Sequence, residues 1–214
     1  HLEVTMKNNV SFNSTLTKFG MGLFETIKVT DYPLDLDLHM NRLFNSIKEL
    51  NLSIENDKEF YKETILKYIK ENNVKNKALR LTVFDEGYNI SLRDITYNED
   101  TYKKGFSLCI SPIKRGDSII YRHKTTNYFE SIYSKHYATD RNFDDAIFLD
   151  SLSNILECSM SNIFFIKSNT IYTPKSSSPI LNGIMKSNVK SICKNLDINL
   201  VECDINISCI DEYD

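Results

Sequence analysis

The sequence predicts an α+β fold in two lobes, on three observations. Segments with the two-residue alternation of strands and segments with helical spacing follow one another along the chain. Residues 112–117 (P-I-K-R-G-D), near the middle, mix proline, glycine and charge as a linker does. The chain has 214 residues, 41% of them hydrophobic, which suffices for one large core or two small ones. We therefore expect lobes at residues 1–113 and 121–214, a linker at 114–120, and a cleft between the lobes as the place for a small molecule.

The first lobe is expected to hold three strands and two helices. Apolar and polar side chains alternate in the expected strands, residues 23–29, 79–84 and 106–110. The first helix is marked by apolar residues on one face, Leu43, Ile47 and Leu50. Asn56 and Glu59 form a capping-box pattern that opens the second helix. The buried stripe of that helix is expected to be Tyr61, Ile65, Tyr68 and Ile69. Residues 85–94 are polar and contain Gly87, so we expect a loop there.

The second lobe is expected to hold two helices among four short strands. A helix over residues 127–137 would turn three side chains inward, Tyr128, Ile132 and Tyr133. The expected strands, separated by turn-forming residues, are 146–149, 163–166, 171–173 and 198–201. After Gly183, helical spacing recurs in the apolar residues Met185, Val189, Ile192, Cys193 and Leu196. Both lobes thus mix helices and strands.

Composition excludes several classes of function. A net charge of −3, with lysines and glutamates scattered, predicts no nucleic-acid partner. Since no apolar run reaches the roughly 18 residues of a membrane span, we expect no membrane association. The five cysteines form no C-x-x-C pair and are expected to be reduced thiols of a cytoplasmic protein. No H-x-x-x-H pattern occurs, and we expect no catalytic metal.

Short motifs along most of the chain carry a family resemblance. In chain order they are 20–26 (G-M-G-L-F-E-T), 39–43 (H-M-N-R-L), 123–128 (H-K-T-T-N-Y), 144–150 (D-D-A-I-F-L-D), 156–162 (L-E-C-S-M-S-N), 172–174 (Y-T-P) and 181–186 (L-N-G-I-M-K). Each motif alone is weak, but their order and spacing resemble those of class IV aminotransferases. The resemblance implies a two-lobed fold-type IV pyridoxal 5′-phosphate (PLP) enzyme, similar in fold to D-amino acid aminotransferase. It also implies that the second lobe binds PLP and that the cofactor lies in the cleft between the lobes.

Within this resemblance, Lys124 would be the catalytic lysine that forms a Schiff base with PLP. Its amine must be neutral to attack the cofactor aldehyde, and once freed by the substrate it can move the substrate's Cα proton. Glu157 would pair with the pyridine nitrogen and keep it protonated. Without the motifs, a solvated lysine and a surface glutamate are the default interpretations of these two residues.

The remaining cofactor contacts are also implied by the resemblance. Arg42 would bind the phosphate, because a guanidinium group matches phosphate oxygens. A second anion site would come from backbone N–H groups at a helix N-terminus, those of Gly183, Ile184 and Met185. Lys186 follows them at a position where the family usually has arginine. Asn127 and Tyr128 would lie near the cofactor, with a place in the core as the alternative for Tyr128.

The resemblance implies a homodimeric aminotransferase that moves an amino group between an amino acid and a 2-oxo acid. The substrate-side candidates are Thr26, Arg80 and Arg93. The first alternative is an aminodeoxychorismate lyase, which forms 4-aminobenzoate and pyruvate. Residues 182–185 and Thr26 favour the lyase, whereas residues 84–87 (F-D-E-G) replace the S-R-G signature that many lyases carry. The second alternative is a catalytically inactive PLP-fold binding protein, because we expect the strand and loop that complete this fold in the family to be missing from the C-terminal end.

Overall fold

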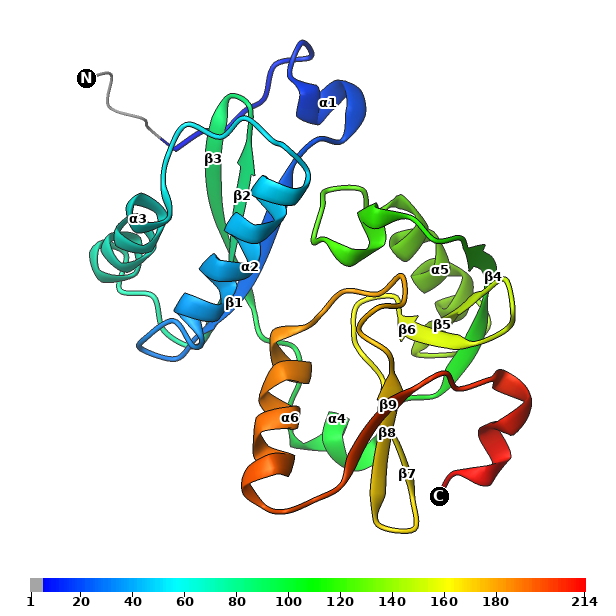
Figure 1. The fold of residues 1–214 in the computed structure, drawn as a ribbon. Helices are drawn as coiled ribbons and strands as arrows, with labels where there is room; N and C mark the ends of the chain where they lie inside the picture. The colour runs from blue at the N-terminus through cyan, green and yellow to red at the C-terminus, as the bar shows by residue number, and fades with distance from the viewer. Residues whose placement is uncertain (1–5) are drawn as a thin grey trace. The chain divides into compact units, whose positions relative to one another are not determined.

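The computed structural model describes residues 6–214, and the described chain forms two compact units (Figure 1). Unit 1 is His1–Tyr97 with Lys124–Asn127, and unit 2 is Asn98–His123 with Tyr128–Asp214. This division differs from the expected lobes, because residues 98–113 belong to unit 2 and the linker expected at 114–120 lies inside that unit. The segment with the candidate lysine, Lys124–Asn127, belongs to unit 1, although the residues on both sides of it in the chain belong to unit 2.

The segment that we expected to be a linker begins inside a strand. Residues 114 and 115 end β4 (Leu108–Arg115), and the 3₁₀ turn η1 (Ile119–Arg122) follows shortly after. The register between β4 and its neighbour shifts between Ile110 and Lys114. Such a bulge accommodates Pro112, which has no N–H group to offer to a sheet. Proline therefore lies in an irregular strand here and not in a linker. The pairing with β5 (Asp145–Asp150), which shows that the segment is a strand, joins residues distant in sequence.

Unit 1 is a three-stranded antiparallel sheet with two helices on one face. Its elements are α1 (Thr15–Phe19), β1 (Leu23–Val29), α2 (Leu36–Glu49), α3 (Lys58–Glu71), β2 (Lys77–Phe84) and β3 (Gly87–Asp94). The core between the sheet and the helices includes Leu23, Ile27, Leu79, Leu81, Met40, Leu43, Tyr61 and Ile65. Because successive strand residues point to opposite faces, Phe24, Thr26 and Arg80 belong to the face that α2 and α3 do not cover.

The strands expected at 23–29 and 79–84 and both helices of the first lobe are confirmed. The loop expected at residues 85–94 is wrong, because β3 occupies most of it. Tyr88 and Ile90 alternate into the core, and Gly87, with φ of 139°, allows the tight turn from β2. Glycine at such a turn marks a hairpin as readily as a loop, and the alternation beyond it was the available signal.

The start of α3 also differs from the expectation. Its N-cap is Asp57, whose Oδ1 accepts a hydrogen bond from the backbone N of Phe60 at 2.8 Å. The capping box expected from Asn56 and Glu59 is therefore wrong by one position. An aspartate is as good a cap as an asparagine, so the motif spacing alone did not separate the two residues.

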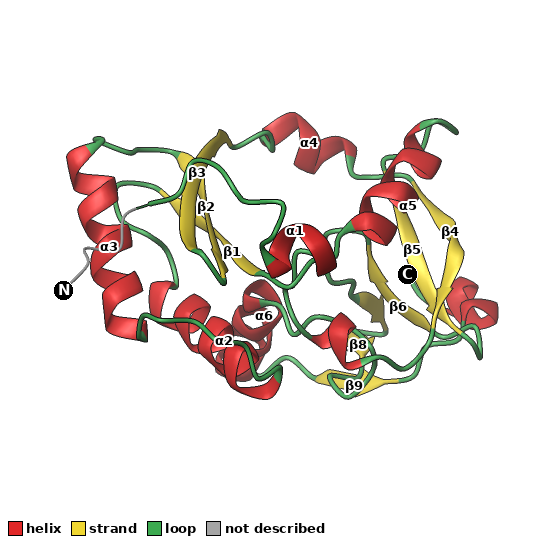
Figure 2. Cartoon of the chain, turned by 90° about the horizontal axis from the view of Figure 1, so that it is seen from above, coloured by secondary structure: helices red, strands yellow, loops and turns green. Residues whose placement is uncertain are grey.

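Unit 2 contains two three-stranded sheets, ordered β4-β5-β6 and β7-β8-β9. Its other elements are α4 (Glu99–Lys104), α5 (Phe129–Thr139), β5 (Asp145–Asp150), β6 (Ile155–Cys158), β7 (Phe165–Lys167), β8 (Thr170–Pro174), α6 (Ile184–Asn195), β9 (Leu200–Cys203) and η2 (Ile207–Glu212). Helix α5 packs beside β4 and β5, which Figure 2 shows with helices in red and strands in yellow. In the described part of the chain, no helix combines the length and the apolar character that crossing a membrane requires.

The buried face of α5 is a correction to the sequence analysis. Ile132 and Tyr133 were expected to point inward, but they are 39% and 50% exposed. The helix instead buries small residues, Ser131, Ser134 and Ala138. Ser134 Oγ lies 2.8 Å from Ser111 Oγ of β4, so the helix and the strand approach closely. Only small side chains permit this approach, so the helix turns its serines and alanine toward the strand. The large apolar residues, from which we predicted the buried face, lie on the other side of the helix.

The remaining elements of unit 2 follow the sequence closely. The four expected strands correspond to β5, β7, β8 and β9, and the helix after Gly183 is α6. Strand β6 was not predicted, because its four residues are too few to show an alternation. Of the apolar residues at helical spacing in α6, Cys193 is buried while Met185, Ile192 and Leu196 are mostly exposed.

Candidate functional site

The candidate lysine is held beside strand β1 by its backbone. The N of Phe24 donates to the O of Lys124 at 3.0 Å, and the N of Thr126 donates to the O of Gly22 at 3.0 Å. Between them, Leu23 and Thr125 form an antiparallel bridge. These contacts extend the sheet of unit 1 by a short segment, so the position of Lys124 follows from that of β1.

Two glycines of the G-M-G-L-F-E-T motif make room for this segment. A Cβ added to Gly22 would lie 2.7 Å from Leu16 Cδ1 and 3.0 Å from Thr126 Cγ2. Gly20 has φ of 68°, and a Cβ there would lie 2.7 Å from Asn127 Oδ1. Asn127 Nδ2 also donates to the O of Gly20 at 2.8 Å. Asn127, expected near the cofactor, thus fastens the lysine segment to the glycine motif.

The side chain of Lys124 lies over an aromatic ring. Its Nζ is 4.5 Å from the ring centre of Phe24, and the Cζ of Arg80 is 3.8 Å from the same centre. Both distances are within the range of a cation–π contact, which places the two positive groups around one buried phenyl ring. Nothing in the sequence indicated this role for Phe24 beyond its place in the motif.

The substrate-side candidates share the sheet face of Phe24. In the register of the sheet, Thr26 lies opposite Arg80, and Ala78 lies opposite Arg93. Arg80 and Arg93 are exposed, while Thr26 is half-buried. Arg80 lies over the ring that Lys124 also contacts, whereas Arg93 Nη1 donates to the O of Asp94 at 3.3 Å.

Arg42 lies against the neighbouring residue of β1, on the opposite face of the strand. Its Nε donates to Glu25 Oε1 at 2.7 Å, and its Nη2 donates to Glu25 Oε2. His39 Nδ1 lies 2.9 Å from the same Oε2. Glu25 is 1% exposed; burial alone would raise its pKa, but the hydrogen bonds from Arg42 and His39 outweigh it and hold the pKa below its usual value. The expected phosphate ligand is therefore oriented by a buried carboxylate that sequence reasoning missed.

In unit 2, the candidate carboxylate Glu157 pairs with a buried arginine. Arg115 Nη1 donates to Glu157 Oε1 at 2.6 Å and to the O of Pro179 at 3.2 Å. The guanidinium Cζ of Arg115 also lies 4.0 Å from the ring centre of Phe148 and 4.6 Å from that of Tyr121. Sequence reasoning missed Arg115, since its segment was interpreted as a linker and nothing local to it indicates a buried partner.

Glu157 also contacts the segment that leads into α6. The backbone N of Leu181 donates to Glu157 Oε2 at 3.2 Å, and Asn162 Nδ2 donates to the O of Leu181 at 2.9 Å. Asn162 also explains the glycine of the motif, because a Cβ on Gly183 would lie 2.1 Å from Asn162 Oδ1. A side chain at position 183 would therefore displace Asn162.

Helix α6 begins at Ile184, directly after Gly183, and its start is suited to an anion. The N-cap Gly183 has no side chain to occupy the first amides, and the first turn, which is fully described, contains no acidic residue. The first amides of a helix have no partner within the helix, and the helix dipole favours negative charge there. Of the three residues whose backbone N–H groups were expected at a helix N-terminus, Gly183 is the N-cap and Ile184 and Met185 are the first two helical residues. Tyr128 is the N-cap residue of α5 and is half-buried.

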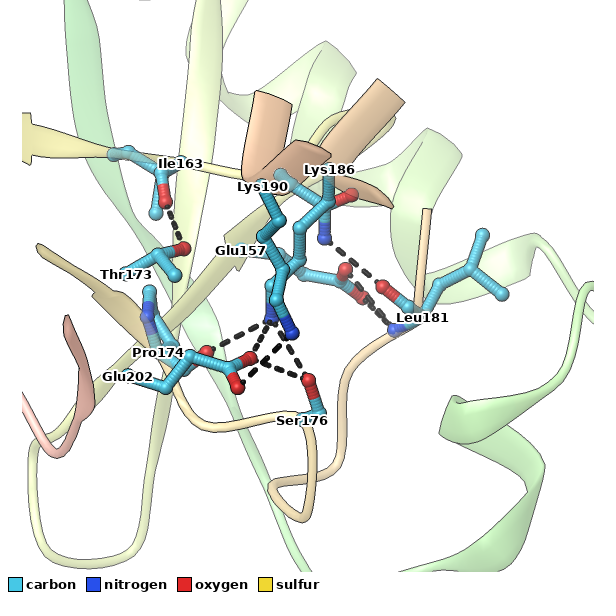
Figure 3. A network of polar contacts seen from close by, with 10 residues as sticks. Glu157, Ile163, Thr173, Pro174, Ser176, Leu181, Lys186, Lys190 and Glu202 are labelled. Atoms are coloured by element: carbon cyan, nitrogen blue, oxygen red, sulfur yellow. Dashed lines mark hydrogen bonds and ion pairs between the residues drawn. The ribbon is translucent and has the colours of Figure 1, made fainter. Parts of the chain in front are cut away.

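The third residue of α6, Lys186, is buried in a polar network that Figure 3 shows. Its Nζ donates to the O of Pro174 at 2.9 Å and lies 3.2 Å from Glu202 Oε1. Lys190 Nζ lies 3.3 Å from Glu202 Oε2, and Ser176 Oγ also donates to Glu202. Burial lowers the pKa of Lys186. Desolvation would raise the pKa of Glu202, but hydrogen bonds from Ser176, Lys186 and Lys190 lower it to about 2.

The candidate residues divide into two groups, called clusters here, according to the unit to which they belong, and within unit 1 Arg42 lies on the opposite face of the sheet from Lys124. Unit 1 holds Arg42, Lys124, Asn127, Thr26, Arg80 and Arg93, and unit 2 holds Tyr128, Glu157, Gly183, Ile184 and Met185. Among residues 6–214, no group of three or more His, Cys, Asp or Glu side chains could hold a metal ion. The chemistry that the clusters offer is an amine, a buried carboxylate and donors for an anion.

Comparisons with known proteins relate the chain as a whole to one family. The model of the family described as amino-transferase class IV matches residues 22–214. A Rickettsia felis protein named "Probable branched-chain-amino-acid aminotransferase" is 30% identical over 193 residues, which are 82% of this chain and 65% of that protein. A Bacillus subtilis aminodeoxychorismate lyase is 25% identical over 203 residues, 85% of this chain and 68% of the relative. The chain thus spans about two thirds of the length of these relatives.

Solved structures agree on the fold. The branched-chain aminotransferase of Thermoproteus uzoniensis with norvaline has a TM-score of 0.87 to this chain at 24% sequence identity, covering 97% of this chain and 77% of that structure. A branched-chain amino acid aminotransferase from T.th., solved with pyridoxamine 5′-phosphate, has a TM-score of 0.85 at 22% identity. That alignment covers 94% of this chain and 74% of the structure. The expected fold class is confirmed by these similarities and by the mixed helices and sheets of both units.

Proposed function

We propose that this chain, which belongs to the class IV aminotransferase family, is a PLP-dependent enzyme that transfers an amino group between an amino acid and a 2-oxo acid. The observation that carries the proposal is the placement of Lys124. Its backbone is fixed to β1 by hydrogen bonds on both sides, and its Nζ lies over Phe24 of the same strand. A lysine held in this way is preorganised, in contrast to a solvated surface lysine.

The residues present fit the cofactor in three respects. Lys124 supplies an amine for the aldehyde, and Glu157 supplies a carboxylate for the ring nitrogen. The first turn of α6 supplies N–H donors for a phosphate. The residue before this turn is Gly183, where Asn162 leaves no room for a side chain. The T.th. structure holds pyridoxamine 5′-phosphate, the amino form of the same cofactor, and this also supports the proposal.

Each side chain has a separate task in the proposed reaction. PLP, when bound, withdraws electrons from the substrate Cα. Lys124 Nζ would act as general base toward the proton of that Cα and then as general acid toward C4′ of the cofactor, the carbon that keeps the amino group. Glu157 would accept a hydrogen bond from the ring nitrogen, and Arg115 Nη1, 2.6 Å from Glu157 Oε1, keeps the carboxylate in place. Arg42 and the amides of Ile184 and Met185 are the candidates that would bind the phosphate.

The substrate carboxylate is assigned to Arg80 in this proposal. Arg80 shares the Phe24 ring with Lys124, so a substrate bound to Arg80 would present its Cα close to the lysine. Thr26, directly opposite Arg80 on β1, adds a hydroxyl group on the same face. Arg93 is the weaker candidate, because its guanidinium contacts the backbone of Asp94.

The second candidate function is aminodeoxychorismate lyase, which the similarity to the Bacillus subtilis lyase favours. The two functions differ in their need for an acceptor. A transaminase converts an amino acid only when an oxo acid takes up the amino group, whereas the lyase releases pyruvate from aminodeoxychorismate without an acceptor. An assay of both reactions therefore decides between them, and the absence of both activities would favour the inactive binding protein.

Lys124→Ala is the variant that tests the mechanism in either assay. We expect it to abolish turnover, because both reactions need the same amine. Lys28→Ala is the matched control, since Lys28 is an exposed lysine of β1 that belongs to neither cluster. Activity retained in Lys124→Ala would exclude the proposed mechanism.

We further propose that the protein is a homodimer. Exposed apolar side chains on α5 support this, since Phe129 is 84%, Tyr133 50% and Ile132 39% exposed. An apolar helix face of this kind is typical of a surface that another chain covers. Light scattering of the purified protein measures the molar mass directly, and a monomer at micromolar concentration would contradict this part of the proposal.

A further inference from the structure

We propose that Lys186 and Glu202 are positioning residues that hold the first turn of α6 in the geometry that binds the cofactor phosphate. The inference rests on the proposed function, because it takes the amides of Ile184 and Met185 as phosphate donors. It adds that these donors depend on an ion pair that lies behind them and does not itself touch the ligand.

The first support is the depth and direction of the Lys186 side chain. Lys186 is 3% exposed, although lysine is among the residue types that are rarely buried without a partner. Its Nζ donates to the O of Pro174, at the end of β8, and pairs with Glu202 of β9. Lys186 Nζ also donates to Ser176 Oγ at 3.4 Å (Figure 3). The first turn of α6 is thus tied to two neighbouring strands.

The second support is that the segment leading into α6, residues 181–186, is also held at its beginning, at Leu181. Glu157 accepts a hydrogen bond from the N of Leu181, and Asn162 donates to the O of Leu181. Gly183, between the two ends, has no room for a Cβ beside Asn162. Residues 181–186 are therefore held at both ends, by Leu181 and by Lys186, and pass close to Asn162 at Gly183. A donor set that is fixed before the ligand arrives binds it without the cost of ordering the backbone.

The third support is electrostatic. A positive charge in the first turn of a helix opposes the helix dipole, so an unpaired lysine there would be unfavourable. The carboxylate of Glu202 compensates this charge, since its Oε1 lies 3.2 Å from Lys186 Nζ and accepts a hydrogen bond from Ser176. Lys186 Nζ is already engaged by three groups of the protein, which identifies it as a support for the turn and not as a phosphate ligand.

The experiment compares the affinity of the full chain for PLP and for pyridoxal, which lacks the phosphate. Binding is followed by absorbance in the wild type and in Lys186→Met. If the displaced turn loses one hydrogen bond to the charged phosphate, the affinity for PLP should fall by about tenfold. We expect Lys186→Met to weaken PLP binding by about this factor while pyridoxal binding stays within about twofold, because only PLP uses the turn.

Two further variants make the comparison specific. Lys190→Met is the matched control, since Lys190 pairs with the same Glu202 carboxylate from an exposed position and should leave both ligands unaffected. Lys186→Arg keeps the charge and should restore PLP binding. Glu202→Gln keeps the side-chain shape and tests the pair even if Lys186→Met does not fold; it should also weaken PLP selectively.

Equal weakening of PLP and pyridoxal in Lys186→Met and Glu202→Gln would overturn the inference, because it would indicate a general loss of structure. Unchanged PLP affinity in both variants would also overturn it. Failure of the proposed function has a different signature: the wild type itself would then form no adduct between PLP and Lys124.

Discussion

Arg115 and Glu157 form a buried ion pair, with Arg115 Nη1 2.6 Å from Glu157 Oε1 and the two side chains 5% and 10% exposed. The arginine donates to the O of Pro179 as well, and it lies over the rings of Phe148 and Tyr121. These contacts fix the guanidinium group independently of the carboxylate. Arg115 therefore determines where Glu157 points, and the residue proposed to meet the cofactor nitrogen has a rigid support.

Arg115→Met should destabilise the protein strongly, because it leaves the Glu157 carboxylate buried without its charged partner. Breaking a buried pair from one side costs about 3–5 kcal/mol in free energy of unfolding. The double variant Arg115→Met/Glu157→Gln also removes the buried negative charge and should recover part of that loss. Urea unfolding of the three proteins measures both effects, and equal stabilities of the single variant and the wild type would contradict the role given to this pair.

Gly183→Ala should be destabilising because of a single clash. The new Cβ would lie 2.1 Å from Asn162 Oδ1, so Asn162 or the turn must move, at a cost of about 1–3 kcal/mol. Gly116→Ala is the control, since a Cβ at Gly116 would meet no described atom within 4 Å. Thermal unfolding compares the two variants. In the Asn162→Ala background, which already lacks the hydrogen bond to the O of Leu181, Gly183→Ala should cost much less stability than in the wild type, and an equal cost in both backgrounds would show that the clash is not the cause.

The Glu202 pair should make the stability of the protein depend on acid. The pKa of Glu202 falls from 4.5 to about 2 in the folded state, so the folded protein holds this carboxylate charged more readily than the unfolded chain does. The resulting stabilisation is fully present above the unfolded pKa and is lost as the pH falls from about 4.5 toward about 2. In Glu202→Gln the unfolding free energy should change less over this window, which urea titrations at several pH values measure. An identical acid slope in both proteins would contradict the assignment.

The sequence predicted those parts of the fold and the site that depend on local patterns. The alternation in β1, the helical spacing in α2 and α3 and the glycine before α6 are all readable within a few residues. The contacts of Lys124 were not, because they join it to Phe24 and Gly22 from a distant part of the chain. The same holds for Arg115, which meets Glu157 42 positions later.

Errors arose where a local pattern has two physical explanations. Proline and glycine near Arg115 indicated a linker, although a bulged strand places the same residues in a sheet. The large apolar residues of α5 indicated a buried face, although close packing on β4 requires the serines on the other side. Glu25 carried no signal of its own, since a buried carboxylate within a strand is recognised only when Arg42 and His39 are placed beside it.

The most direct test of the central claim is reduction of the protein with borohydride after addition of PLP, followed by peptide mapping. We expect an absorbance band of lysine-bound cofactor and a single reduced adduct on Lys124, with none in Lys124→Ala. Label spread over exposed lysines such as Lys28, or no label at all, would contradict the assignment of Lys124 and with it the proposed PLP chemistry.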